Sequence, residues 1–237
     1  MFQFRQWPEG FEFPACVSCN SGTSNHDLLI AMLARMDPFE EKGNLDGSLE
    51  GLMKQTNRQF PGLFEKMRLS AAEARKSNRV LGLQPEVGQT QQETGVVRVP
   101  KEFHEAVCGL ALKLSKGIFY RESGNIFPNN GCLILNWFTN ADFVRDEKYV
   151  ILDLLRDMGG VVPPVTRSGK FLNEQFVYKL SMSPEADLIV VQAIFGNAFG
   201  LVTIGSALPG RLEAIIARLR EKTGNSGPFA VLQSIGS

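Results

Sequence analysis

Apolar side chains near the start of the chain recur every three or four positions, which is the repeat of a helix with one buried face. The members of this stripe are Leu28, Leu29, Met32, Leu33 and Met36. Ser24 is followed three residues later by Asp27, which fits a capping box with a carboxylate near the positive end of the helix. Because Pro38 cannot continue a helix, the pattern predicts a helix over residues 25–36.

The next stretch, residues 39–80, is polar but keeps a helical repeat of apolar side chains. One predicted face holds Leu45, Leu49, Leu52 and Met53. Pro61 is expected to start a second helix, since proline suits the first helical turn. The apolar side chains of that helix are Leu63, Phe64, Met67 and Ala71. From Gly82 to Gly95 glutamine, threonine, glycine and glutamate dominate, so this segment is predicted to be a linker or an exposed loop.

Beyond Val96 the pattern predicts an antiparallel sheet with flanking helices. The helices are expected at residues 100–116, at residues 146–158 and from Pro209 onward, and the strands at residues 132–138, 175–182, 188–195 and 199–205. A turn signal at Asn129-Asn130-Gly131 precedes the first strand. The chain is therefore predicted to be α+β, with an N-terminal helical region at residues 1–81 and a sheet domain at residues 96–237.

One uncharged stretch, between Asp187 and Arg211, is long enough to span a bilayer. Polar and glycine residues interrupt it, and both of its halves favour strand. Gly196-Asn197 between these halves is typical of a hairpin turn. The pattern favours a buried hairpin, and no membrane partner is expected.

The composition of the 237 residues, 43% hydrophobic and 21% charged, is that of a globular protein. Lys and Arg together number 25, as do Asp and Glu, so any nucleic-acid binding must come from a local patch. Residues 51–80 hold such a surplus, with seven basic residues against two acidic ones. Together with Arg35 they could contact phosphates, or they could be solvated helix faces.

Two of the four cysteines, Cys16 and Cys19, form a Cys-x-x-Cys pair. Such a pair can bind one tetrahedral zinc ion, act in redox chemistry or be purely structural. The polar residues that follow Cys19 interrupt the helix that a redox pair requires, which favours zinc. No secretory signal is seen in the sequence, so a cytoplasmic location is expected.

The segment from Trp7 to Pro38, WPEGFEFPACVSCNSGTSNHDLLIAMLARMDP, resembles the second half of an HNH (ββα-metal) endonuclease motif of the uncharacterised bacterial and phage type. In that family an upstream Cys-x-x-Cys completes a structural zinc site, and an upstream Asp-His supplies the general base. The resemblance covers about the first forty residues in detail. It implies a partial zinc knuckle, a ββα remnant, at the N-terminus and metal-dependent hydrolysis of nucleic-acid phosphodiesters.

Position by position, the resemblance makes Cys16 and Cys19 zinc ligands and Asn20 the residue that orients the general base. The remaining ligand of the catalytic metal is His26 or Asn25, with His26 favoured because imidazole is the commoner ligand. Asp27 is a weaker candidate, since capping already explains it. The cofactors implied are a structural zinc ion and a divalent ion such as magnesium. The other interpretation of His26 is an exposed histidine with no ligand role.

The front half of the motif is missing, because no Cys-x-x-Cys and no Asp-His precede Cys16. Two thiolates make only half of a closed zinc site. Three interpretations follow: the true start lies upstream, the motif has decayed, or two chains share a zinc ion as a homo-oligomer. The only other histidine, His104, fits an ordinary helix position. Enzyme activity by this chain therefore stays uncertain, and the alternative function is a non-catalytic zinc-knuckle protein for nucleic-acid binding or interaction.

The C-terminal region offers no nucleophile pattern and no phosphate loop. Its acidic cluster is expected to cap a helix, and it consists of Asp142, Asp146 and Glu147. Its aromatic cluster is expected to be core, and it consists of Trp137, Phe138 and Phe143.

Overall fold

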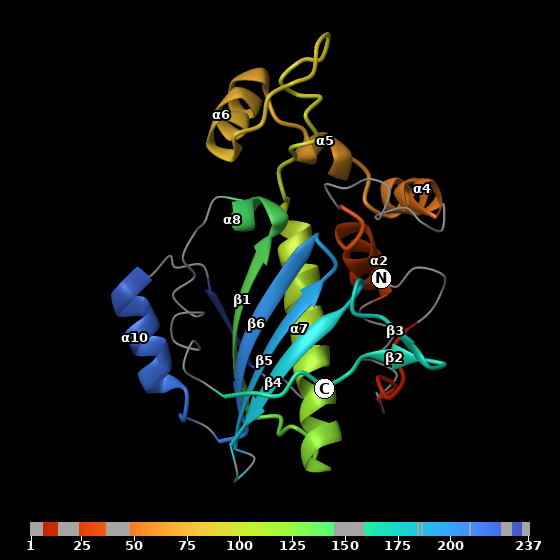
Figure 1. The fold of residues 1–237 in the computed structure, drawn as a ribbon. Coiled ribbons are helices and arrows are strands. Elements are labelled where there is room, and N and C mark those ends of the chain that lie inside the picture. Colours follow the sequence, from red (N-terminus) through yellow and green to blue (C-terminus); the bar gives the residue numbers. More distant parts are fainter. Residues whose placement is uncertain are drawn as a thin grey trace.

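The computed structural model describes residues 7–13, 24–36, 48–144, 159–183, 185, 187–208, 210–223 and 229–233. Within them the chain combines helices with a five-stranded antiparallel sheet, so the predicted α+β class is confirmed (Figure 1). The helix predicted at residues 146–158 lies outside the described residues. None of the helices in the described part combines the length and the hydrophobicity that a bilayer crossing requires.

The sheet has the strand order β4-β5-β6-β1-β7, with every pair antiparallel. Its strands are β1 (Cys132–Thr139), β4 (Val177–Met182), β5 (Leu188–Phe195), β6 (Phe199–Ser206) and β7 (Phe229–Gln233). The first four were predicted from alternation and turn signals, whereas β7 was not. The predicted hairpin is confirmed, because β5 and β6 pair along their full length and Gly196 takes the positive φ of 55° that the turn needs.

The two faces of the sheet carry separate clusters of apolar side chains, as strand alternation requires. One face packs against helix α7 (Lys101–Ser123), and helix α2 (Ser24–Leu33) packs against α7 in turn. The other face packs against helix α10 (Glu213–Thr223), preceded by the buried Leu212 (Figure 1). The larger cluster joins α2, α7 and the sheet in one hydrophobic core.

The helix predicted from the N-terminal stripe exists, with Leu28, Leu29, Met32 and Leu33 buried as expected. After Leu33 the chain continues in turns to Met36. The side chain of Ser24 lies outside the described part of the chain, and the carboxylate of Asp27 lies 3.3 Å from the ammonium of Lys113 on α7. The helix predicted to end at residue 116 is α7, which runs on to Ser123.

Residues 48–100 form a helical arm at the end of the sheet where α7 begins (Figure 1). Its helices are α4 (Leu49–Gln59), α5 (Leu63–Met67) and α6 (Ala71–Leu81). The prediction of one continuous helix from Pro61 past Ala71 is wrong. Ser70 caps a new helix, because its side chain accepts a hydrogen bond from the Glu73 amide while the Glu73 carboxylate accepts one from the Ser70 amide.

The segment after α6 is an exposed loop, as predicted, and Val87 at its tip is fully exposed. It is also tied back to the arm at several points. Gln92 donates a hydrogen bond of 2.7 Å to the carbonyl of Leu69, and the Arg98 amide donates one of 2.8 Å to the carbonyl of Met67. These contacts hold the loop against α5 and α6.

Candidate functional site

The Trp-Pro loop of the HNH-like segment packs against a small hairpin formed by β2 (Thr166–Arg167) and β3 (Lys170–Phe171), which was not predicted. The guanidinium of Arg167 lies 4.3 Å from the Trp7 ring centroid and donates a hydrogen bond of 3.0 Å to the Trp7 carbonyl. Nearby, the ring of Phe11 contacts the rings of Phe176 and Tyr178 edge-on. This part of the segment is thus bound to the sheet region.

The candidate ligands Cys16, Cys19 and Asn20 lie outside the described residues, so their placement stays a prediction. Of the candidate residues on α2, Asn25 is exposed and His26 is half-buried. Asp27 forms the ion pair with Lys113, which gives its carboxylate a structural partner besides the helix start.

The ring of His26 lies against the backbone of α7. Its Nδ1 is buried and has no hydrogen-bond partner among the described residues, and a Cβ placed on Gly109 would lie 3.3 Å from that nitrogen. Because a metal ion needs open space at a ring nitrogen, only Nε2 of His26 could serve as a ligand atom.

Within the described residues no three His, Cys, Asp or Glu side chains lie close enough together to hold a metal ion. The candidates on α2 for a catalytic ion, zinc or magnesium, remain His26 through Nε2 and the exposed Asn25. Cys16 and Cys19, whose thiolate chemistry suits zinc, remain the predicted zinc ligands.

The second histidine, His104 on α7, forms a contact between helix and sheet. Its Nδ1 accepts a hydrogen bond of 2.9 Å from the indole N–H of Trp137, and its Nε2 lies 3.6 Å from the sulfur of Cys108. In neutral His104 the proton therefore sits on Nε2, which can donate to the sulfur but cannot accept its proton. Burial raises the pKa of Cys108, so the pair lacks the features of an activated thiol.

The residues around the end of β1 are structural. The carboxylate of Asp142 accepts hydrogen bonds of 2.7 and 2.8 Å from the amide and hydroxyl of Thr139, at the start of helix α8 (Asn140–Val144). Asp142 thus takes part in the start of α8, a short helix that was not predicted. The helix that it was predicted to cap, at residues 146–158, lies outside the described residues. Phe138 is buried and Trp137 is partly buried against the core, as expected. Asp146, Glu147 and the side chain of Phe143 lie outside the described part.

The surplus of positive charge predicted for residues 51–80 lies on the helical arm. Two of its cations are paired, because Lys54 lies 2.6 Å from Glu50 and Lys66 binds Glu102. The other five are exposed and form no ion pair with any described carboxylate: Arg58, Arg68, Arg75, Lys76 and Arg79. Arg35 was considered as a possible phosphate contact together with this surface, but it is buried and does not belong to it. Its side chain is only 8% exposed and donates a hydrogen bond of 2.6 Å to Ser48.

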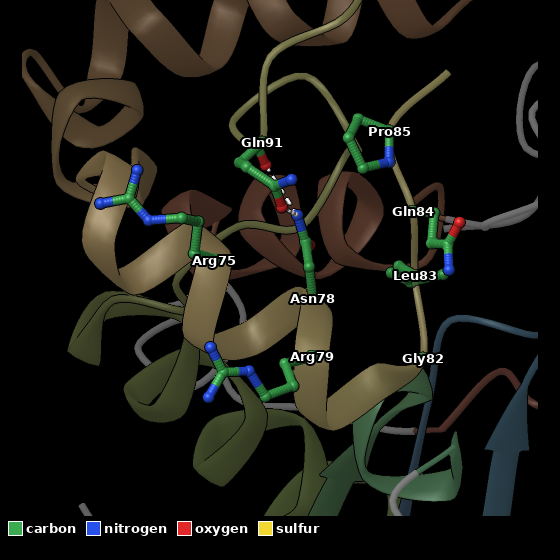
Figure 2. Close-up of a pocket in the computed structure, with 8 residues that line it drawn as sticks. All are labelled: Arg75, Asn78, Arg79, Gly82, Leu83, Gln84, Pro85 and Gln91. Carbon is green, nitrogen blue, oxygen red and sulfur yellow. Dashed lines mark hydrogen bonds between the residues drawn. The ribbon is translucent and has the colours of Figure 1, made fainter. Parts of the chain in front are cut away.

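A pocket of about 400 Å³ opens between α6 and the loop after it. It is lined by Arg75, Asn78, Arg79, Gly82, Leu83, Gln84, Pro85 and Gln91. Figure 2 shows the two arginines extending from α6 to the same side, with Gln84 and Pro85 on the other side. None of the lining residues is acidic, so the pocket combines two guanidinium groups with neutral amide and apolar groups.

The pocket was not predicted from the sequence. Its shape depends on Asn78, which is 1% exposed and donates hydrogen bonds of 2.9 and 2.8 Å to the backbone carbonyl and side-chain oxygen of Gln91. The sequence carries two partial signals of this geometry: the capping pair Ser70 and Glu73, and Gly82 at the helix end.

Comparison with family models, with curated proteins and with solved structures finds no match to this chain.

Proposed function

We propose that this protein is an HNH-endonuclease-like protein that binds nucleic acid through its helical arm and has little or no nuclease activity as this chain. The observation that carries the proposal is the set of five exposed cations on the arm that form no ion pair with the described residues. A phosphate backbone can bind such cations without breaking an existing ion pair, and it releases counterions as it does so. Since the whole chain has zero net charge, the arm would direct the nucleic acid to one region.

The HNH-like part of the proposal assigns zinc to Cys16 and Cys19, and the roles of Asn20 and His26 remain those of the motif. Two chains together would supply four thiolates, so a shared zinc ion would produce a homodimer. A complete motif would hydrolyse phosphodiesters with a histidine as the base. That base would be the upstream histidine of the motif, and His26 corresponds to the metal-ligand position. Its Nδ1 is buried against Gly109, which leaves Nε2 as the ligand atom. We also propose a cytoplasmic location for the protein.

The test is the salt dependence of binding to a labelled DNA duplex, measured by fluorescence anisotropy. Each phosphate contact contributes about 0.9 to the slope of log K against log salt, so R68Q/K76Q should reduce that slope by about 1.8. The matched control is R218Q/R220Q, which removes two exposed arginines from α10. It should leave the slope unchanged. Absence of binding at low salt, or equal slopes for both variants, would overturn the proposal.

The prediction of weak or absent cleavage is tested separately with magnesium or zinc in excess. Efficient cleavage of duplex DNA that is lost in H26A would show that the chain is an active nuclease. In that case the non-catalytic part of the proposal is wrong.

A further inference from the structure

The pocket beside α6 has features that a general cationic surface does not need. Gln91 is held in place through its oxygen, which accepts the 2.8 Å hydrogen bond from the buried Asn78. Its amide nitrogen forms no hydrogen bond with a described residue, and in Figure 2 it points to the side where Gln84 and Pro85 lie. A fixed amide with free donors is suited to the polar edge of a ligand.

The remaining walls of the pocket differ in chemistry. Leu83 and Pro85 supply an apolar surface, and Gln84 supplies a second amide that has no hydrogen bond within the described part of the chain. Arg75 and Arg79 lie one helical turn apart on α6 and supply two positive charges. A ligand that contacts the apolar surface, the amides and the two arginines together carries a planar ring with a polar edge and an adjacent anion.

We propose that this pocket binds one unpaired nucleotide of a single-stranded nucleic acid, an inference that rests on the proposed function. The base lies against Leu83 and Pro85 with its edge toward Gln84 and Gln91, and its phosphates contact Arg75 and Arg79. A paired base cannot occupy the pocket, because its edge is used by its partner and its faces by the stack. The volume of about 400 Å³ falls in the range of small-molecule sites.

The experiment compares a labelled single strand with a duplex of the same sequence at equal salt. The wild type should bind the single strand about tenfold more tightly, which corresponds to about 1.4 kcal/mol from one bound base. R75Q/R79Q should remove most of this preference. The matched control is K76Q, since Lys76 is an exposed cation on the same helix that does not line the pocket. K76Q should weaken binding to both forms equally and keep the ratio.

Two further measurements identify what enters the pocket. Q84A changes an exposed side chain, so it should fold normally and lower affinity for the single strand alone. A single strand with abasic sugars should bind like the duplex. If the abasic strand binds as tightly as the normal one, the pocket recognises phosphate only and the inference is overturned.

Failure of this inference can be told apart from failure of the proposed function. Salt-dependent duplex binding with no preference for single strands would overturn the nucleotide pocket and leave the proposed function standing. Absence of binding to both forms would overturn both.

Discussion

Replacement of Gly200 with alanine tests how tightly the sheet packs on its α10 side. Gly200 lies in β6 opposite Phe138 of β1. A Cβ at this position would lie 2.5 Å from two ring carbons of Phe138 and 3.1 Å from the carbonyl oxygen of Ala193. Carbon atoms in contact are about 3.5–4.0 Å apart, so the ring would have to move by about 1 Å. Because Phe138 is only 2% exposed, that movement would disturb the packed core.

The size of the effect follows from two opposing contributions. Overpacking of a core destabilises the folded state by about 1–3 kcal/mol. Replacing glycine with alanine also lowers the conformational entropy of the unfolded chain, which stabilises the folded state by about 0.4–1 kcal/mol. The G200A variant should therefore lose about 1–2 kcal/mol of unfolding free energy. For a chain of this size each kcal/mol lowers Tm by about 2–4 °C, so Tm should fall by about 2–8 °C. Circular dichroism during heating and urea unfolding measures both quantities.

The matched control is the same substitution in the arm. Gly51 lies in α4, and a Cβ there would meet no atom within 4 Å, so G51A should be neutral or stabilising by about 0.5–1 kcal/mol. In the double variant F138L/G200A the smaller side chain should relieve the clash, giving a cost below the sum of the single changes. If G200A unfolds at the wild-type temperature, the ring is free to move and the reasoning about packing is wrong.

Three further predictions concern the arm, the buried thiol and the zinc pair. S70A removes the α6 cap and should cost about 0.5–2 kcal/mol in urea unfolding. The backbone hydrogen bond from Ser70 holds the pKa of Glu73 below its ordinary 4.5, so the carboxylate's stabilisation is complete above that value and is lost as pH falls through the lower folded pKa. A difference between wild type and E73Q that is constant from neutral to strongly acidic pH would contradict this. Because burial raises the pKa of Cys108 above 9.0, iodoacetamide should alkylate it more slowly than free cysteine at pH 8 in a variant whose other cysteines are serine. Mass spectrometry should find one zinc ion per two chains, and full zinc retention in C16S/C19S would contradict the assigned ligands.

The parts of the fold that were predicted correctly depend on neighbours in the sequence. The β5–β6 hairpin needs only two apolar runs and the Gly196-Asn197 turn, and α2 needs only its stripe. Strand β7 was missed because β1, its partner in the described sheet, lies about a hundred residues earlier in the chain. The start of α6 was missed because the apolar repeat from Met67 to Ala71 continues across it, although Ser70 provides a cap.

Of the candidate site on the helical arm, only the excess of basic residues could be predicted from the sequence. The surplus of basic residues was evident in the sequence, but the burial of Arg35 depends on its contact with Ser48, thirteen residues later. The pocket requires Asn78 to reach Gln91 across a loop, a contact that no local pattern indicates. The place of His26 depends on Gly109 in a different helix, where the absence of a side chain leaves room for the ring.

The attachment of the Trp-Pro loop to the sheet region bears on the order in which the protein can fold during synthesis. Trp7 binds Arg167, which leaves the ribosome 160 residues later, and Phe11 packs on Phe176 and Tyr178, which leave later still. Trp7 and Phe11 have local contacts with Glu12 and Phe13, but their partners in the sheet region are absent until those later residues have been made. Contacts between residues so far apart in the sequence form slowly. Until they form, the aromatic side chains of residues 7–13 are exposed and can bind chaperones.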